Sequence, residues 1–203
     1  DFYHCAIRFI DNAASYTNYI DPRFDDIKWR KTSEFKKEFD KMWYSKTGFL
    51  LIDAGMRQLQ ETGFLHNRCR MQMVIFANKY LRINMLDPKY GSQVWFSRLL
   101  LDAIGIAQNK MNNNWSLDFD LSGRRFGVGI SGRGMNISNI EIKKFDPECN
   151  YIKKWLPHLK DIPNKELYKW NDEIAEKYNN IHPPPIFDSK ERYQEWVNLT
   201  KHM

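Results

Sequence analysis

Apolar residues along much of this chain recur every three or four positions, which is the pattern of an amphipathic helix. Asp53 can cap a helix over AGMRQLQET (54–62), in which Met56 and Leu59 share one face. Gly63 follows where the end of a helix favours a left-handed residue. The pattern therefore predicts a helix that begins after Asp53 and ends before Gly63.

Further helices are predicted downstream, and the pattern as a whole is mostly helical. A core face formed by Met71, Val74, Ile75 and Tyr80 predicts a helix over 66–82. Other helices are predicted over 91–104, 151–159 and 190–199, while glycine and asparagine clusters make 109–140 loop-rich. We expect an all-α fold in which residues 1–203 form a single helical unit.

Composition narrows the function classes. The net charge of +6 weakly favours a polyanionic partner. Three widely separated cysteines, Cys5, Cys69 and Cys149, argue against a disulfide framework, a four-cysteine metal site and an iron–sulfur site. The longest apolar runs are too short to span a bilayer. We therefore expect a soluble intracellular protein without a metal centre or membrane partner.

The stretch HNRCRM (66–71) places an imidazole, an amide and two guanidinium groups within five positions. On a helix, Asn67, Arg70, Met71 and Val74 fall on one stripe, and Arg68 lies beside it. Because the stripe continues into core positions, Arg70 is expected to be at least partly buried and to need an anionic partner. Asp102 is the obvious candidate. From the residues alone, a purely structural Arg70–Asp102 ion pair is the favoured interpretation.

A resemblance changes that interpretation. Five blocks of the sequence together resemble the photolyase/cryptochrome family: KTGFLLIDAGMRQLQETGFLHNRCRM (46–71), SRLLLDA (97–103), NNNW (112–115), KFDPECNYIKKWLPHLKDIPNKELYKW (144–170) and HPPPIFDSKER (182–192). The HNRCRM form is closer to the photolyases that repair cyclobutane pyrimidine dimers than to animal cryptochromes. The resemblance implies the C-terminal part of a helical domain that binds FAD at the bottom of a cavity open to DNA.

The resemblance also implies roles for individual residues. Asn67 and Arg70 would approach the flavin, with Arg70 paired to Asp102 beside the ring system. Asn67, Arg68 and Met71 would line the cavity that receives a damaged dinucleotide, with Arg68 toward phosphate. Further DNA contacts are expected from Tyr3, Arg124, Arg125 and Arg133.

The reaction implied is light-driven electron transfer from reduced FAD to a pyrimidine dimer, so no side chain has to act as acid, base or nucleophile. Trp115 would be the flavin-proximal member of an electron-transfer relay, and Trp29 its surface end. The middle tryptophan of the usual relay is replaced by Pro88. Tyr90 and Trp95 are the candidate substitutes.

Other positions depart from the family pattern. Ile104 replaces an acidic residue near the flavin, and Leu117 replaces an aromatic residue that normally packs on the lesion. A short insertion leaves Asn109 or Asn112 as the asparagine expected against flavin N5, with Asn109 preferred. Ile137 stands where the family has proline.

The N-terminal antenna domain and the phosphate-binding stretch of the family are absent from this sequence, so we expect a piece of a longer or split protein. The leading hypothesis is a deoxyribodipyrimidine photolyase-like enzyme, a carbon–carbon lyase once the full FAD site is assembled. Its partners would be dimer-containing DNA and the missing N-terminal half. Two alternatives stay open: a cryptochrome-like photoreceptor without repair, and a flavin-free helical DNA-binding remnant.

Overall fold

The computed structural model of the chain describes residues 26–99, 101 and 137–200. Within these ranges every regular element is helical and there is no strand, which confirms the all-α prediction. The first half contains α2 (Thr32–Trp43), α3 (Leu50–Thr62), α4 (Asn67–Ile75), the π-helical turn η3 (Phe76–Tyr80) and α5 (Ser92–Leu99). The second half contains η4 (Asn139–Glu141), α7 (Ile142–Phe145), α8 (Asn150–Trp155), η5 (Pro157–Leu159), α9 (Asn164–Leu167), α10 (Asp172–Lys177) and α11 (Ser189–Thr200).

The predicted helices are found, but several of their boundaries were wrong. The helix predicted over 91–104 ends at Leu99, and the one predicted over 151–159 is divided at Leu156 into α8 and η5. Helix α3 begins at Leu50, with Phe49 as its N-cap, so Asp53 lies inside the first turn instead of capping the helix. The carboxylate of Asp53 is used by the loop that precedes α3, as described below. Gly63 ends α3 in the left-handed conformation, with φ of 65°, as its position predicted.

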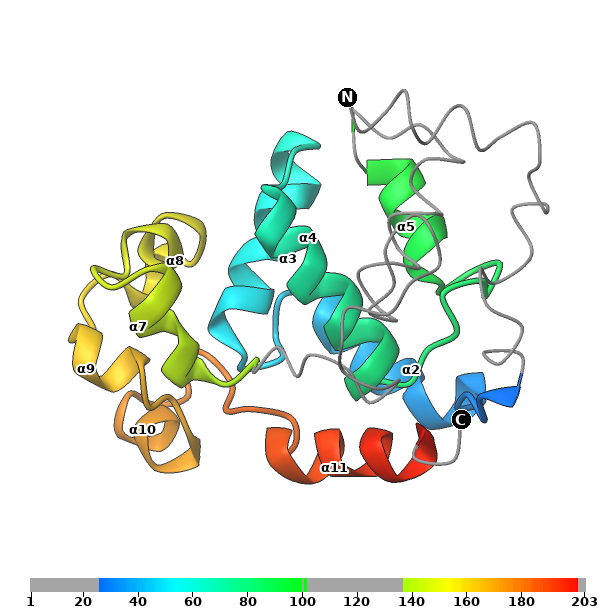
Figure 1. Ribbon diagram of the computed structural model, residues 1–203. Helices are drawn as coiled ribbons and strands as arrows, with labels where there is room; N and C mark the ends of the chain where they lie inside the picture. Colours follow the sequence, from blue (N-terminus) through cyan, green and yellow to red (C-terminus); the bar gives the residue numbers. More distant parts are fainter. Residues whose placement is uncertain (1–25, 100, 102–136, 201–203) are drawn as a thin grey trace.

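Two hydrophobic clusters meet at α3. The larger cluster joins α2, α3, α4, η3 and the start of α11. The smaller one joins the first turn of α3 to the short helices α7 to α10. Figure 1 shows α3 and α4 side by side in the centre, with α7–α10 to one side and α11 running along the bottom. Helix α3 therefore contributes to both halves of the core.

Helices α3 and α4 pack directly against each other, with Gly55 of α3 facing Met73 of α4. A Cβ atom built on Gly55 would lie 3.4 Å from the sulfur of Met73, at the edge of ordinary van der Waals contact. Both residues are buried. This packing fixes the direction of α4 relative to α3.

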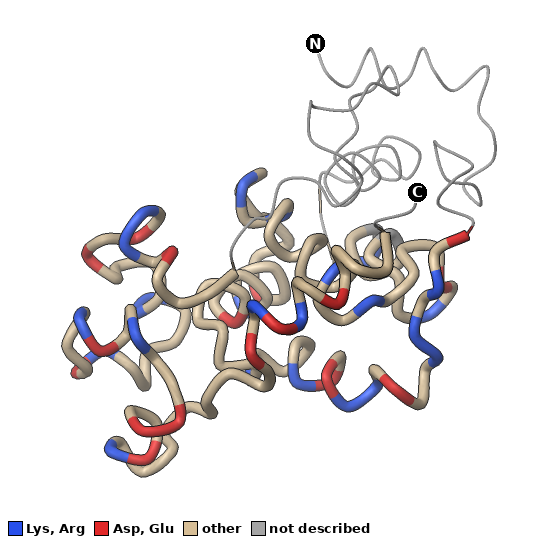
Figure 2. The backbone as a smooth tube through the Cα atoms, turned by 60° about the horizontal axis from the view of Figure 1, so that its bottom comes forward, with Lys and Arg blue, Asp and Glu red and all other residues tan. Residues whose placement is uncertain are grey.

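Helix α11 is held by aromatic packing and by ion pairs. The Tyr80 ring lies 6.2 Å from Phe187 and 6.0 Å from Tyr193 between ring centroids. Glu38 on α2 pairs with Arg30 and, at 3.0 Å, with Arg192 of α11. Lys, Arg, Asp and Glu are otherwise interspersed along the described elements (Figure 2).

Candidate functional site

The polar stretch at 66–71 forms the start of α4. His66 is the N-cap, and its Nδ1 accepts a hydrogen bond of 3.2 Å from the backbone N–H of Arg68. His66, Asn67 and Arg68 are exposed, while Met71 is half-buried against the larger hydrophobic cluster. Three polar side chains therefore lie open to solvent at one helix end.

Arg70 is buried, with 5% of its surface exposed, as its place on the stripe predicted. Its Nε donates a 2.6 Å hydrogen bond to the carbonyl oxygen of Leu65. Its guanidinium carbon lies 5.7 Å from the ring centroid of Phe64. The expected partner Asp102 lies outside the described residues, so the Arg70–Asp102 pair stays a prediction.

The charge at this helix end runs against the usual preference. The first turn of α4 contains no acidic residue, and Arg68 and Arg70 follow directly on the N-cap. Backbone N–H groups make a helix N-terminus partly positive, which favours anions and disfavours cations. The start of α4 is therefore electrostatically suited to a bound anion such as phosphate.

One buried polar side chain further along the same face has no hydrogen-bond partner. Both amide atoms of Asn78, a fully buried residue of η3, are unpaired in the structure. Arg70, Val74 and Asn78 are spaced four residues apart and so share a face. Phe76 and Tyr80, which contact Phe187, fall on the other side of the helix. A buried unpaired amide is costly, and a polar ligand on the Arg70 face would remove that cost.

Trp29, the expected surface end of the relay, is half-buried and lies against Trp196 of α11, with 5.9 Å between ring centroids. Both tryptophans belong to a third, small hydrophobic cluster that also contains Met85. Of the proposed substitutes for the middle tryptophan, Tyr90 contacts Phe35 and Phe39 on α2, and Trp95 contacts its neighbour Phe96. Sequence reasoning missed Trp196, although its spacing with Tyr193 and Thr200 was that of a buried helical face.

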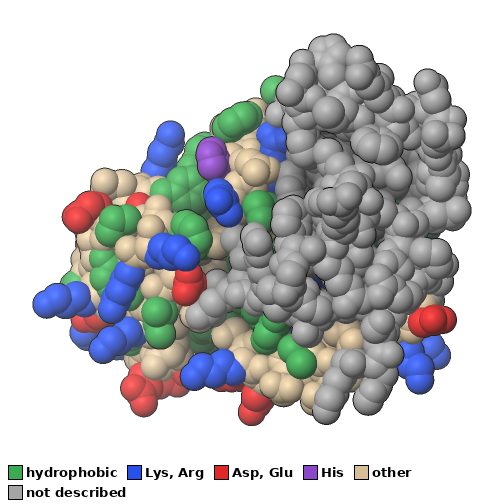
Figure 3. Space-filling model, in the orientation of Figure 1, with side chains coloured by type: hydrophobic (Ala, Val, Ile, Leu, Met, Phe, Trp, Pro, Cys, Tyr) green, Lys and Arg blue, Asp and Glu red, His purple; other side chains and the backbone are tan. Residues whose placement is uncertain are grey.

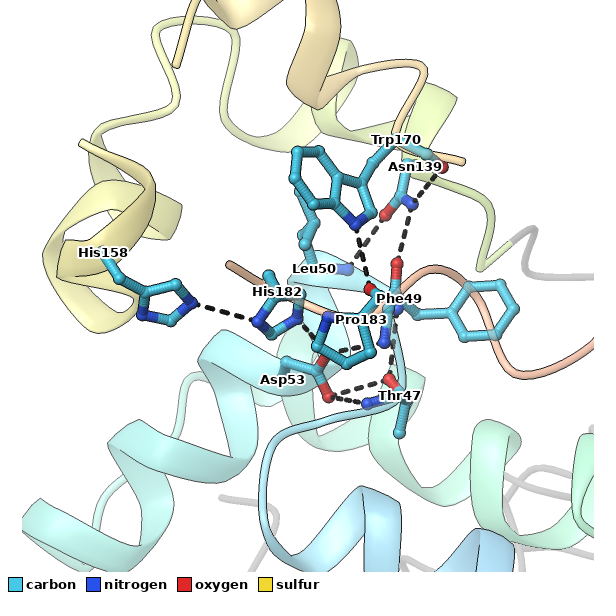
Figure 4. A network of polar contacts seen from close by, with 10 residues as sticks. Thr47, Phe49, Leu50, Asp53, Asn139, His158, Trp170, His182 and Pro183 are labelled. Atoms are coloured by element: carbon cyan, nitrogen blue, oxygen red, sulfur yellow. Dashed lines mark hydrogen bonds and ion pairs between the residues drawn. The ribbon is translucent and has the colours of Figure 1, made fainter. Parts of the chain in front are cut away.

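A second polar constellation surrounds Asp53, and sequence reasoning missed it. The fully buried carboxylate accepts hydrogen bonds from the Thr47 backbone at 2.9 Å and the Thr47 hydroxyl at 2.8 Å. It also accepts from the Gly48 backbone and from Nε2 of His182, both at 2.9 Å. His182 Nδ1 lies 3.0 Å from Nε2 of His158. Figure 4 shows the three side chains in line.

Asn139 closes this network from the other side. Its Oδ1 accepts from the backbone N–H of Leu50 at 2.9 Å, and its Nδ2 donates to the carbonyl oxygens of Gly48 and Trp170. The Trp170 indole N–H donates to the carbonyl oxygen of Pro183 at 3.0 Å (Figure 4). The network therefore joins the start of α3 and the loop before it to segments between 89 and 129 residues later.

The network leaves little free chemistry. A carboxylate only accepts hydrogen bonds, so Nε2 of His182 donates to Asp53, and Nδ1 of the same ring is engaged by Nε2 of His158. Burial, together with repulsion from His182 and Arg57, lowers the pKa of His158 below 6.5. The described atoms around Asp53 are mutually satisfied, which is the arrangement of a structural joint.

Several expected site residues fall outside the described ranges: Tyr3, Asp102, Asn109, Trp115 and Arg133. Among the residues that the structure describes, there is no cluster of three metal-ligating side chains. Within the same ranges, no helix is long and apolar enough to cross a membrane.

Comparison with known proteins gives a consistent result. Residues 1–202 match the model of the FAD binding domain of DNA photolyase. A deoxyribodipyrimidine photo-lyase of Synechococcus is 33% identical over 157 residues, which is 76% of this chain and 29% of that protein. The corresponding Escherichia coli protein is 28% identical over 198 residues, 94% of this chain and 38% of its own. The chain thus spans about a third of these relatives.

Solved structures agree on the fold. An archaeal photolyase from Sulfolobus tokodaii superposes with a TM-score of 0.80 at 24% identity, covering 99% of this chain and 42% of that one. A class III photolyase from Agrobacterium tumefaciens gives a TM-score of 0.79 at 23% identity, and the match covers 99% of this chain and 40% of that one. With the family model matching almost its whole length, the chain belongs to the FAD-binding domain family of the DNA photolyases.

Proposed function

We propose that this chain is the C-terminal part of a photolyase FAD-binding domain and acts in the light-driven repair of cyclobutane pyrimidine dimers. It would work within a longer or split protein whose other part supplies the N-terminal antenna domain and the rest of the FAD site. The observation that carries the proposal is the start of α4, where Asn67 and Arg68 are exposed beside buried Arg70 in a chain of this family.

The described residues fit a flavin on one side of α4. Arg70 brings a buried positive charge to that face, and Asn78 brings a buried amide that has no partner in the structure. Asn67, Arg70, Asp102 and Asn109 are the residues proposed to hold the cofactor. The chemistry that FAD supplies when bound is transfer of an electron to the dimer after light absorption.

The protein's own side chains would bind and orient the damaged DNA. Arg68 is exposed at the positive end of a helix, where a phosphate group gains from both the guanidinium and the backbone N–H groups. Tyr3, Asn67, Met71 and Arg133 are proposed as further DNA contacts. Extrusion of a dimer into the site is favoured because damaged bases stack and pair poorly.

Trp115 and Trp29 are proposed as the inner and outer members of an electron-transfer relay. The structure supports only the outer part, where Trp29 lies near the surface and against Trp196.

Cys69 and Cys149 are free thiols in the structure, and this agrees with a reducing, intracellular setting. We propose such a setting for the assembled protein.

The decisive experiment combines two measurements on the full chain, alone and with an N-terminal photolyase half supplied separately. The first is the visible absorption spectrum before and after blue light with a thiol reductant. The second is the repair of an oligonucleotide that carries one thymine dimer. A flavin band with light-dependent repair supports the proposal, whereas absence of flavin in both preparations contradicts it.

A second function is favoured by one observation. A Gloeobacter violaceus cryptochrome DASH is 34% identical over 146 residues, which is 71% of this chain. A cryptochrome-like photoreceptor would hold flavin and respond to light. Flavin photoreduction without dimer repair would select this function over the first.

A further inference from the structure

An aromatic side chain is exposed directly before the arginine-bearing helix. Phe64 keeps 53% of its surface in contact with solvent. Single exposed hydrophobic residues are common and need no explanation by themselves. Phe64 differs because it lies directly before α4, next to exposed Arg68 and with the guanidinium of Arg70 over its ring.

The backbone of Phe64 is tied to the end of α3 through the hydroxyl group of Thr62. Oγ1 of Thr62 accepts from the Phe64 N–H at 3.2 Å, and its one proton points between the carbonyl oxygens of Gln58, at 2.7 Å, and Phe64, at 3.1 Å. Gly63 precedes it in the left-handed conformation, held by a 2.9 Å bond from its N–H to Leu59. The ring is therefore presented from a defined turn between α3 and α4.

A second hydrophobic side chain extends the exposed surface. The backbone N–H of Leu101 donates to the carbonyl oxygen of Gly63 at 2.9 Å, and Leu101 is 87% exposed. Phe64 and Leu101 are thus anchored to neighbouring positions of the same turn. Figure 3 shows hydrophobic, basic and histidine side chains next to one another on this face of the molecule.

The surroundings of the Phe64 ring are basic. The guanidinium of Arg70 lies 5.7 Å from the ring centroid, and Arg68 is exposed in the first turn of α4. A ring that is exposed beside cations suits a ligand with a flat apolar face and a negative charge a few ångströms away. A nucleotide has both, because its base is planar and its phosphate is anionic.

We propose that Phe64 is a stacking platform for an unpaired base of the bound DNA, with Leu101 at its edge and Arg68 on the neighbouring phosphate. The proposal rests on the DNA-binding function above and adds a contact that selects strands with unstacked bases. Aromatic stacking is tolerant of base identity, so the contact would favour distorted or single-stranded sites without reading sequence.

The test uses the full chain and a labelled single-stranded oligothymidylate, with affinity measured by fluorescence anisotropy over a range of salt. Phe64→Ala is expected to weaken binding on the order of tenfold, since a base–aromatic stack contributes about that much. Phe64→Leu keeps an apolar side chain without a ring and should fall between. The slope of affinity against salt should not change in either variant, because no phosphate contact is lost.

Phe145 offers a matched control. It is 41% exposed, and Nζ of Lys144 lies 5.3 Å from its ring centroid, so it reproduces the chemistry of Phe64 on α7, far along the chain. Phe145→Ala should leave the affinity unchanged. A 2-aminopurine placed in the oligonucleotide should be quenched by the parent chain and by Phe145→Ala, and released from quenching in Phe64→Ala.

The outcomes separate this inference from the function on which it rests. Parent-like affinity and quenching in a folded Phe64→Ala variant would overturn the stacking platform, and an effect of Arg68→Ala would still support DNA binding. Equal weakening by Phe64→Ala and Phe145→Ala would also overturn it, because the effect would be non-specific. Failure of the parent chain to bind any oligonucleotide, both alone and with the N-terminal photolyase half supplied, would overturn both proposals.

Discussion

Of the two polar regions at the ends of α3, one follows the electrostatic preference of a helix N-terminus for negative charge and the other goes against it. At the start of α3, the acidic Asp53 lies in the first turn, where the helix N-terminus favours a negative charge, and its oxygens accept four hydrogen bonds. After α3, the basic Arg68 and Arg70 stand at the start of α4, where the same effect disfavours them. The region around Asp53 is buried and its hydrogen bonds are satisfied, whereas the start of α4 leaves Arg68 open to solvent above buried Arg70.

The difference indicates which region serves folding and which serves binding. A satisfied buried network stabilises one arrangement of the chain and has nothing left to offer a ligand. A helix end that gathers positive charge costs stability until an anion arrives. We therefore expect substitutions around Asp53 to act on stability and substitutions around Arg68 to act on binding.

The largest effect is expected for Asp53→Ala. The change removes a carboxylate from two backbone N–H groups and strands His182 in the interior, so unfolding should become easier by about 3–5 kcal/mol. Urea denaturation measures this directly. Asp172→Ala, an exposed carboxylate in the first turn of α10, is the control and should cost less than about 1 kcal/mol. Equal losses in the two variants would contradict the assigned role of Asp53.

The next largest effects on stability are expected at two glycines with positive φ, which form a matched pair. Gly48 has φ of 76°, and a Cβ atom there would lie 2.2 Å from the backbone carbon of Pro184. Gly63 has φ of 65°, but its Cβ would first meet the side chain of Leu101, which is exposed. Gly48→Ala should therefore cost more than about 2 kcal/mol, and Gly63→Ala about 1 kcal/mol. Thermal unfolding of both variants would show the order, and a reversed order would refute it.

The pH dependence of stability tests the far end of the buried network. Because the pKa of His158 is lowered in the folded protein, the unfolded chain binds more protons just below pH 6.5. Stability should then fall as pH drops through 6.5 toward the folded pKa, and this loss should shrink in His158→Gln. Unfolding midpoints at neutral pH and at about pH 5 measure the loss.

Asp53, His182 and Arg57 are the charged or titratable groups that act on His158. If the loss of stability with falling pH is the same in His158→Gln and in the parent, the acid sensitivity comes from another group.

The smallest effect on stability is expected for Arg68→Ala, within about 0.5 kcal/mol of the parent, because the side chain is exposed. Its effect on DNA should be distinct: weaker binding and a salt dependence reduced by about one phosphate contact. An unchanged salt slope would remove Arg68 from the DNA surface, and Lys165→Ala on α9 offers an exposed cation for comparison.

Local patterns were sufficient for much of the fold. The period of apolar residues predicted α3, α4 with η3, and α11, and the continuation of the Arg70 stripe into Val74 predicted burial of Arg70. Helix α2 carried a similar signal, since Phe35, Phe39 and Met42 are spaced as a buried face. The short helices α9 and α10 hold too few residues to show a period.

Contacts between distant segments were beyond such patterns. His182 looked like the start of an extended proline segment, and nothing near it in sequence points to Asp53. The pairing of Trp29 with Trp196 depends in the same way on how α11 crosses the molecule. For the site, the family resemblance selected Asn67, Arg68 and Arg70, whereas the exposure of Phe64 became visible only in three dimensions.

The hydrogen bond between Asp53 and His182 joins positions 129 residues apart. During synthesis, α3 leaves the ribosome long before its buried carboxylate can meet the imidazole, so that carboxylate must stay hydrated until nearly the whole chain has emerged. Pairings of such high contact order are slow to form. A nascent or truncated chain that stops before residue 182 would therefore hold an unfinished joint, and it would be a natural target for chaperones and proteases.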